Sequence, residues 1–341
     1  MNETRRALLD ALAEGPASGP ALADRLGVSR AAVWKQVEAL RAAGFEIESD
    51  GDGYRVAGTP EYGAEAVEFG LAAPYRVDYH DAVGSTNDRA RELATAGATD
   101  VVVLADEQTG GRGRLDRPWT APPGGVWLSV VLRPDRPPAH APLVTLAAAV
   151  ATARACREVG VDAGIKWPND VVVPAGTGGT DRASETTEPG DGRRGNGSPT
   201  AATGYAAERK LAGILTEMAG EADRIGWLVV GVGVNANVDP GALPATATSL
   251  RAEVGEVDRR RFVQRLLEAF HELSVDLEDV VDAWRDHATT IGRRVRVDTP
   301  GGVVAGEAVD VTDVGALVVR TDAGDRVVHA GDCEHLRPAG E

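Results

Sequence analysis

Lysine is almost missing from this sequence of 341 residues, which has only Lys35, Lys166 and Lys210. Arginine supplies the other basic side chains, and 52 acidic residues against 36 basic ones leave a formal charge of −16. Such a charge does not favour non-specific binding to nucleic acids or to anionic membranes. Because lysine is so scarce, each of the three lysines is a candidate for a specific role.

Cysteine is equally rare. Cys156 and Cys333 are too few for a disulfide framework and lack the spacing of a metal site. The chain opens with "MNETRRALLDALAEG", which is too polar for a signal peptide. The most apolar run, Ala141 to Ala155, is too short to cross a bilayer and contains an arginine. We therefore expect a soluble, cytoplasmic protein without a membrane partner.

Residues 1–58 have the pattern of a winged helix-turn-helix. Helical stretches end at Gly15 and Gly27, and Ser29 then caps a third helix that begins at Arg30. Two alternating strands follow around an Asp-Gly-Asp-Gly turn. Helices, a glycine-containing turn and a hairpin in this order indicate a DNA-binding head, with a small helical bundle carrying an added hairpin as the alternative.

Arg30 and Lys35 are the candidate DNA contacts of this head. They lie in the N-terminal half of the third helix, the part that enters the major groove in such folds. The head as a whole has more carboxylates than basic groups, and Asp50 and Asp52 at the wing tip would repel phosphate. The sequence thus predicts DNA binding through one face only.

From about Tyr75 the pattern changes to α/β. Apolar strands alternate with helices, Ser85 opens one of these helices, and a long alanine-rich helix is predicted over 141–159. Residues 174–207 are mostly Gly, Pro, Ser and Thr without apolar periodicity, which predicts a disordered insertion. Residues 258–287 are predicted to be helical, and 292–338 alternate around glycine turns as in a small β-barrel.

The segment "DEQTGGRGRLDRPW", Asp106 to Trp119, holds three glycines and three arginines. Guanidinium groups bind phosphate or carboxylate in a planar fork, and glycines let backbone N–H groups approach the same anion. This loop therefore predicts an anionic ligand.

Four further motifs narrow that ligand: "GSTN" (84–87), "KWPND" (166–170), "KLAGIL" (210–215) and "GVGVNAN" (231–237). Together with "GRGRLDRPW", and in this order, they resemble the motifs of biotin–protein ligases. With the N-terminal head, nearly the whole chain resembles the bifunctional type that also represses transcription. The resemblance implies an α+β protein with three domains: the winged head (1–58), a mixed-sheet ligase domain of the biotin/lipoate ligase type (75–290, with the insertion 174–207) and an SH3-like β-barrel (291–338).

The resemblance also implies the reaction. Such enzymes join biotin to ATP, which gives biotinyl-5′-adenylate and pyrophosphate, and then transfer biotin to a lysine of a biotin carboxyl carrier protein. Mg²⁺ would clamp the phosphates, so no fixed metal site built by the protein is expected. The family further implies a homodimer in the adenylate-bound form, which would present two heads to DNA.

Carried over motif by motif, the resemblance assigns three groups of residues. The catalytic group is Lys210, Arg112 and Arg114. The biotin-binding group is Ser85, Thr86, Asn87, Gln108, Gly111, Arg112, Gly113, Arg114, Lys210, Gly213 and Gly233, with Gly231 as a further close approach. The ATP-binding group is Arg117, Trp119, Lys166, Asn169, Asp170 and Asn235.

Other interpretations remain open at this point. The chain could be a regulator that senses biotin without catalysis, a ligase with a vestigial head, or a lipoate–protein ligase, although the last lacks the arginine loop. Single residues also have structural alternatives. Ser85 could be only a helix cap, Trp119 and Trp167 core residues, Arg117 a surface charge, Asp170 a turn residue and Lys166 half of an ion pair.

Overall fold

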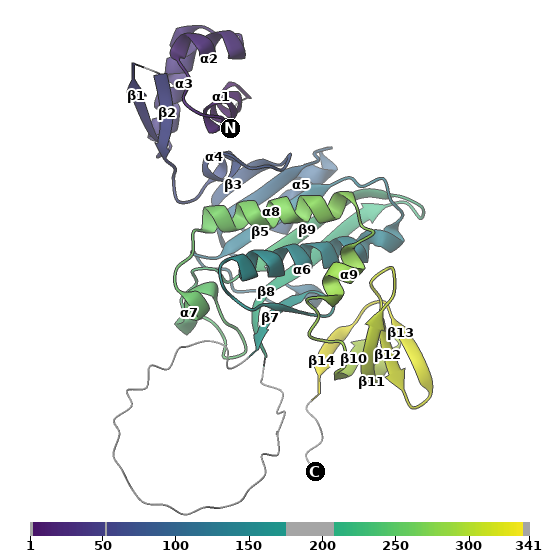
Figure 1. Ribbon diagram of the computed structural model, residues 1–341. Helices are drawn as coiled ribbons and strands as arrows, with labels where there is room; N and C mark the ends of the chain where they lie inside the picture. Colours follow the sequence, from purple (N-terminus) through teal and green to yellow (C-terminus); the bar gives the residue numbers. More distant parts are fainter. Residues whose placement is uncertain (1–2, 52, 175–207, 337–341) are drawn as a thin grey trace, which may run out of the picture.

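The computed structural model describes residues 3–51, 53–174 and 208–336, and Figure 1 shows three parts in chain order. A small helical head with a two-stranded sheet comes first, a larger α/β body follows, and a small β domain ends the described chain. This is the α+β class that the sequence predicts. The predicted insertion after Pro174 lies outside the described residues.

The head is a helix-turn-helix with a wing. Its elements are α1 (Glu3–Ala13), α2 (Gly19–Leu26), α3 (Arg30–Ala42), β1 (Glu46–Asp50) and β2 (Gly53–Gly58). Ser29 begins α3 as predicted, because its Oγ accepts a hydrogen bond from Ala32 N at 3.1 Å. Val33, Val37 and Leu40 on one face of α3 pack with leucines of α1 and α2 in a separate core. The predicted winged head is therefore confirmed.

A short helix, α4 (Ala64–Glu68), joins the head to the body. Arg6 of α1 donates to Glu68 at 3.0 Å, and Glu68 also accepts from Val77 N at 2.7 Å. Phe45 of the head meets Phe69 edge to face at 5.8 Å between ring centroids. One buried carboxylate thus connects the first helix of the head to the first strand of the body.

The body is built on a seven-stranded sheet with the order β3-β4-β5-β9-β8-β7-β6. Its strands are β3 (Arg76–Val83), β4 (Val101–Gln108), β5 (Val126–Leu132), β6 (Gly164–Lys166), β7 (Asp170–Pro174), β8 (Glu208–Gly220) and β9 (Ile225–Val234). Only β3 and β4 pair in parallel, and every other neighbouring pair is antiparallel. The sheet is mixed, as the sequence predicts.

Helices cover both faces of this sheet (Figure 1). The helices of the body are α5 (Thr86–Thr95), α6 (Ala141–Glu158), α7 (Leu250–Val254), α8 (Arg259–Val275) and α9 (Val280–Arg285), with single 3-10 turns at Arg114–Asp116, Pro138–His140 and Pro240–Ala242. Side chains of β4 alternate between the two layers. Val102 and Leu104 join the large core that includes α6 and α8, whereas Val103 packs with Ala90 and Ala94 of α5.

Three expectations need correction. The predicted helix over 258–287 is two helices, because α8 ends at Val275 and α9 begins at Val280. "KWPND" is the turn of the β6–β7 hairpin, with a cis Trp167–Pro168 bond, and not the middle of one strand. The helix over Pro138–Glu158 is long and apolar enough to cross a membrane by length and composition. However, most of this helix is buried inside the fold, as in a core helix.

The last part is a five-stranded antiparallel sheet with the order β13-β12-β11-β10-β14. Its strands are β10 (Arg294–Thr299), β11 (Gly302–Val311), β12 (Leu317–Thr321), β13 (Gly324–Val328) and β14 (Asp332–His335). Trp167 of the body donates from Nε1 to Gly315 O at 3.0 Å, which ties the two parts together. A small C-terminal β domain is present where the sequence predicts one.

Candidate active site

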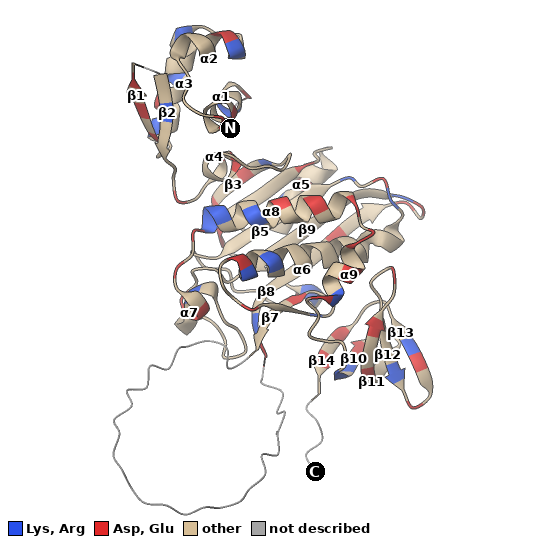
Figure 2. Cartoon of the chain, viewed as in Figure 1, with Lys and Arg blue, Asp and Glu red and all other residues tan. Residues whose placement is uncertain are grey.

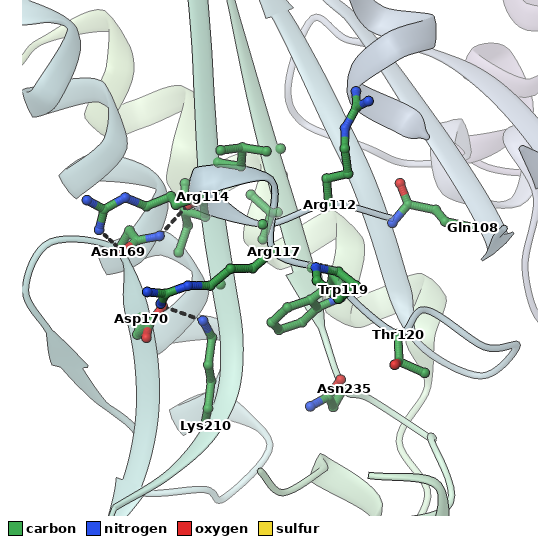
Figure 3. Close-up of a pocket in the computed structure, with 18 of the residues that line it drawn as sticks. Gln108, Arg112, Arg114, Arg117, Trp119, Thr120, Asn169, Asp170, Lys210 and Asn235 are labelled. Carbon is green, nitrogen blue, oxygen red and sulfur yellow. Dashed lines mark hydrogen bonds and ion pairs between the residues drawn. The ribbon is translucent and has the colours of Figure 1, made fainter. Parts of the chain in front are cut away.

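A pocket of about 450 Å³ lies against β8 and β9 beneath the arginine loop (Figure 3). Its volume is in the range of small-molecule sites. The lining includes all but two of the residues that the sequence assigns to biotin and ATP: Ser85, Thr86, Asn87, Gln108, Arg112, Gly113, Arg114, Arg117, Trp119, Asn169, Asp170, Lys210, Gly213, Gly231, Gly233 and Asn235. Motifs far apart in the sequence therefore meet in one cavity.

The two exceptions are Gly111 and Lys166, which do not belong to the lining. A Cβ on Gly111 would lie 2.6 Å from Trp119 O, so this glycine serves the internal packing of the loop. Lys166 ends β6, one turn of the hairpin away from Asp170, and its charge lies near the Cys333 thiol. Burial raises the pKa of that thiol to about 12, which disfavours its reactive thiolate form.

Uncharged polar groups gather at the start of α5. Thr86 donates to Gln108 Oε1 from its backbone N at 2.8 Å and from its hydroxyl at 3.0 Å. Ser85 caps the helix by accepting from Asp88 N, as its structural alternative predicts, and it also lines the pocket. This end of the pocket presents amide and hydroxyl groups without a net charge.

Sequence reasoning missed Ser129, which holds this polar group in place. Its Oγ lies 2.8 Å from Thr86 Oγ1 and 2.6 Å from Asn87 Oδ1, with the serine fully buried in β5. A lone serine within the apolar stretch "VWLSVVL" was a usable signal, because a polar group on a fully buried strand needs a partner.

Glycines on β8 and β9 make room for side chains that line the pocket. A Cβ on Gly231 would lie 2.1 Å from Asn87 Oδ1, and one on Gly233 would lie 3.1 Å from the Trp119 ring nitrogen. A Cβ on Gly213 would approach Lys210 Nζ to 3.2 Å. A methyl group at any of these positions would therefore displace a side chain of the pocket.

Lys210, Asp170 and Trp119 form the other end of the pocket. Lys210 Nζ lies 2.6 Å from Asp170 Oδ1 and 5.1 Å from the centroid of the Trp119 ring. Trp119 in turn meets Trp127 edge to face at 6.4 Å between centroids. Among the described residues, Trp119 Nε1 and Asn235 Oδ1 are buried without a hydrogen-bond partner. Two unpaired polar atoms on a pocket wall fit a site that binds a polar ligand.

The arginine loop closes over this pocket and reaches the C-terminal domain. Arg114 donates to Asn169 Oδ1 at 3.1 Å and to Gly331 O at 2.6 Å, and Arg117 lies 2.6 Å from Asp332. Arg112 points to the other side, towards Asp88 of α5 (Figure 3). Asp332, which the sequence analysis did not single out, thus lines the site from a different domain.

Leu115 and Asp116 explain how the loop turns. Both residues have a left-handed backbone, with φ of 57° and 54°. Such a conformation is unfavourable for residues other than glycine, at roughly 1–2 kcal/mol each. It places Arg114 and Arg117 on the same side of the loop, since Gly113 N donates to Arg117 O at 2.8 Å. The spacing in "GRGRLDR" therefore sets where the guanidinium groups lie.

Divalent cations would find few protein ligands here. Asp170 and Asp332 are the carboxylates of the lining, and each already contacts a basic side chain. Mg²⁺ commonly keeps water and phosphate oxygens as most of its ligands and needs one or two carboxylates. Asp170 fits such a role if the ion arrives with a nucleotide.

Comparison with known proteins assigns these parts to families. The model of the biotin/lipoate A/B protein ligase family matches residues 81–235. A helix-turn-helix domain model matches residues 4–55, and the model of the biotin protein ligase C-terminal domain matches residues 290–336.

Individual relatives agree. The chain is 35% identical over 335 residues to the bifunctional ligase/repressor BirA of Bacillus subtilis, and the match covers 93% of each chain. It is 33% identical over 268 residues to the biotin–[acetyl-CoA-carboxylase] ligase of Mycobacterium tuberculosis, which covers 74% of this chain and 86% of that one.

A solved structure supports the fold. The biotin protein ligase of Aquifex aeolicus in complex with biotin and ATP superposes with a TM-score of 0.57 at 22% identity, over 77% of this chain and 99% of that chain. The body, the C-terminal domain and the head are thus each accounted for, and the chain belongs to the biotin protein ligase family, in the bifunctional form that carries an N-terminal helix-turn-helix domain.

Proposed function

We propose that this protein activates biotin with ATP as biotinyl-5′-adenylate and then transfers the biotinyl group to a lysine of a biotin carboxyl carrier protein. One observation carries the proposal. A single cavity has an uncharged polar end at Ser85 and Thr86 and a cationic end at Lys210 and Arg114. Biotin has an uncharged ureido head and a carboxylate, which match these two ends in order.

In this proposal the uncharged end binds the ureido ring. The hydroxyl and amide groups at this end belong to Ser85, Thr86, Asn87 and Gln108. Ser129 holds Thr86 and Asn87 in place through hydrogen bonds. The valeryl chain then runs along the glycines of β8 and β9, Gly213, Gly231 and Gly233, with Gly113 of the loop above it. Gly111 does not contact the ligand in this proposal, and it serves the packing of the loop instead.

The nucleotide occupies the end near Trp119. Its ring offers an aromatic face for adenine, and Asn235, with its unpaired Oδ1, offers an acceptor. Arg117, Asn169 and Asp170 face the phosphates. We leave Lys166 out of this set, because it does not line the pocket.

The first step joins two anions. A carboxylate oxygen of biotin attacks the α-phosphorus, the new O–P bond forms, and the bond to the leaving pyrophosphate breaks. Lys210 and Arg114 would neutralise the charge that builds up on the phosphoryl oxygens, and Arg112 would join them once it leaves Asp88. Mg²⁺ arriving with ATP supplies further charge neutralisation on the phosphates. Lys210 is already positioned by Asp170 at 2.6 Å.

The second step moves the biotinyl group. The amine of the carrier lysine attacks the acyl carbon, the C–O bond to AMP breaks, and AMP leaves with the electron pair. The arginine loop is the cover of the adenylate in this proposal, since Arg114 fastens it to both Asn169 and Gly331. A fastened loop would keep water and foreign amines from the activated acyl group.

The same protein, we propose, represses transcription in the cytoplasm when it holds the adenylate. Arg30 and Lys35 of α3 would contact DNA, and a homodimer would present two heads to a two-fold site. The functional units proposed for the chain are the head (1–58), the catalytic part (75–290) and the C-terminal β domain (291–338). A sensor without catalysis is the second candidate, but it has no use for Lys210 and two arginines gathered at one cavity.

Exchange of labelled pyrophosphate into ATP tests the proposal. Exchange that depends on biotin supports adenylate formation, and labelling of a purified carrier domain tests the transfer. A gel-shift assay on the protein's own biotin-gene promoter, with and without biotin plus ATP, tests the repressor. No biotin-dependent exchange would leave the sensor as the better assignment.

A further inference from the structure

The helix α3 presents an exposed face that none of the contacts within the described chain covers. Arg30, Ala31, Trp34 and Lys35 are exposed, whereas Val33 and Val37 on the opposite side are buried. The positions i, i+1, i+4 and i+5 lie on one side of a helix. Trp34 is the largest of these side chains and is 57% exposed. An aromatic ring is thus held in solvent between two cations.

These two cations differ from the other basic groups of the head. The other five all bind within the chain: Arg5 to Glu65, Arg6 to Glu68, Arg25 to Glu14, Arg41 to Glu38 and Arg55 to Glu48. Within the part of the chain that the structure describes, Arg30 and Lys35 have no ion pair or hydrogen bond. The exposed face of α3 is therefore the place where the head offers uncompensated positive charge.

Charge and position favour DNA as the occupant of this face. The protein carries a net charge of −16, and Figure 2 shows acidic residues on the neighbouring strand β1, so free cations on α3 stand out. The four residues fall in the first half of α3, which spans Arg30–Ala42. That half of a recognition helix meets the base edges in helix-turn-helix proteins.

We propose that Trp34 and Ala31 contact thymine methyl groups in the major groove and so determine the sequence specificity of this head. Apolar side chains select thymine because its C5-methyl is the one apolar group exposed in the major groove. Arg30 and Lys35 flank this contact and bind phosphate oxygens. The inference rests on the proposed DNA-binding function and adds the group that the head would select, the C5-methyl of thymine.

The test begins with the full chain, biotin and ATP, and a library of random DNA duplexes. Enriched duplexes are resynthesised with each thymine replaced in turn by uracil, which removes only the methyl group. At one or two positions of each half-site we expect binding to weaken about fourfold per methyl, from the transfer free energy of one buried carbon. Trp34→Ala should bind more weakly and no longer distinguish thymine from uracil at its position.

Three comparisons make the result specific. Trp34→Phe keeps an apolar ring and should keep the thymine preference, whereas Arg30→Ala should weaken all duplexes alike. Biotin-dependent pyrophosphate exchange should stay at the wild-type rate in each variant, which shows that the body is intact. Circular dichroism of the exposed-site variants should match the wild type.

Enriched duplexes that tolerate uracil everywhere would overturn the inference while leaving the repressor in place. Failure to enrich any duplex would remove both. If Trp34→Ala lowers self-association of the adenylate-bound protein in sedimentation without DNA, the ring belongs to a protein interface, and the thymine contact is wrong.

Discussion

Replacing Lys210 by alanine should slow adenylate formation at least a hundredfold while leaving the fold intact. The lysine side chain is 34% exposed and its ammonium lies 2.6 Å from Asp170 Oδ1. A unit charge about 4 Å from the developing negative charge stabilises it by roughly 4 kcal/mol at an effective dielectric of about 20, and by about 1 kcal/mol in water. A partly exposed lysine falls between these limits, and about 3 kcal/mol corresponds to roughly a hundredfold in rate.

Stability should change much less than rate. The Lys210–Asp170 pair is partly exposed, and such ion pairs contribute about 0–1 kcal/mol after solvent screening. The melting temperature of Lys210→Ala should therefore stay within a few degrees of the wild type. This difference separates a catalytic effect from simple unfolding.

The assay is biotin-dependent exchange of pyrophosphate into ATP at saturating substrates, with Lys166→Ala as the matched control. Both variants remove one of the three lysines, but Lys166 does not line the pocket and should exchange at nearly the wild-type rate. Near-normal exchange in a folded Lys210→Ala protein would refute the reasoning. A loss in Lys166→Ala as large as that in Lys210→Ala would show that the pocket geometry does not define the phosphate site.

Four further predictions follow from the same contacts. Arg114→Gly removes the bonds to Asn169 and Gly331, so adenylate should escape and biotinylate bystander lysines; tight retention of adenylate would contradict a covering role. Replacing residues 176–203 by a short turn should preserve carrier biotinylation, because Pro174 and Glu208 are already paired across the β7–β8 hairpin; a large drop would assign the segment a role. Replacing Arg30 and Lys35 together by alanine should abolish the adenylate-dependent shift of promoter DNA but not ligation, and an unchanged shift would reject α3 as the DNA contact. This double variant is a cleaner test than deleting residues 1–57, because the deletion removes Arg6, the partner of the buried Glu68. Burial raises the pKa of Glu208, but His335 and Arg293 outweigh this effect and lower the pKa below its ordinary value of 4.5. The ionised carboxylate therefore stabilises the fold above pH 4.5, and this stabilisation is lost as the pH falls through the folded pKa. Glu208→Gln should thus lower the melting temperature at neutral pH and match the wild type in strong acid; an equal deficit at every pH would point to packing instead.

Local chemistry explains why much of this protein could be predicted from the sequence. Ser29 and Ser85 begin helices in any context that offers free N–H groups, so the sequence placed α3 and α5 correctly. Side-chain alternation likewise predicted the strands, and the run "GRGRLDR" predicted a loop for an anionic ligand. The winged head followed from such short-range patterns, whereas the mixed sheet and most of the pocket lining followed from the resemblance of the motifs to those of biotin–protein ligases.

Other features depend on contacts between distant segments. Asp170 and Lys166 belong to one motif and pair across the β6–β7 hairpin, yet only Asp170 lines the pocket. Asp332 meets Arg117 across a domain boundary, and Ser129 meets Thr86 between neighbouring layers. No local pattern encodes such pairs, since they form only when the sheet and the C-terminal domain have packed.

The sequence by itself determined which residues are candidates for the chemistry: the scarce Lys210, the arginines of the loop and the glycines of β8 and β9. Tertiary structure decided which of them share a cavity and which carboxylate holds each cation. The physical reason is range. Capping, turns and alternation act over a few residues, whereas the direction of a guanidinium or ammonium group is fixed by partners that packing brings within hydrogen-bond distance.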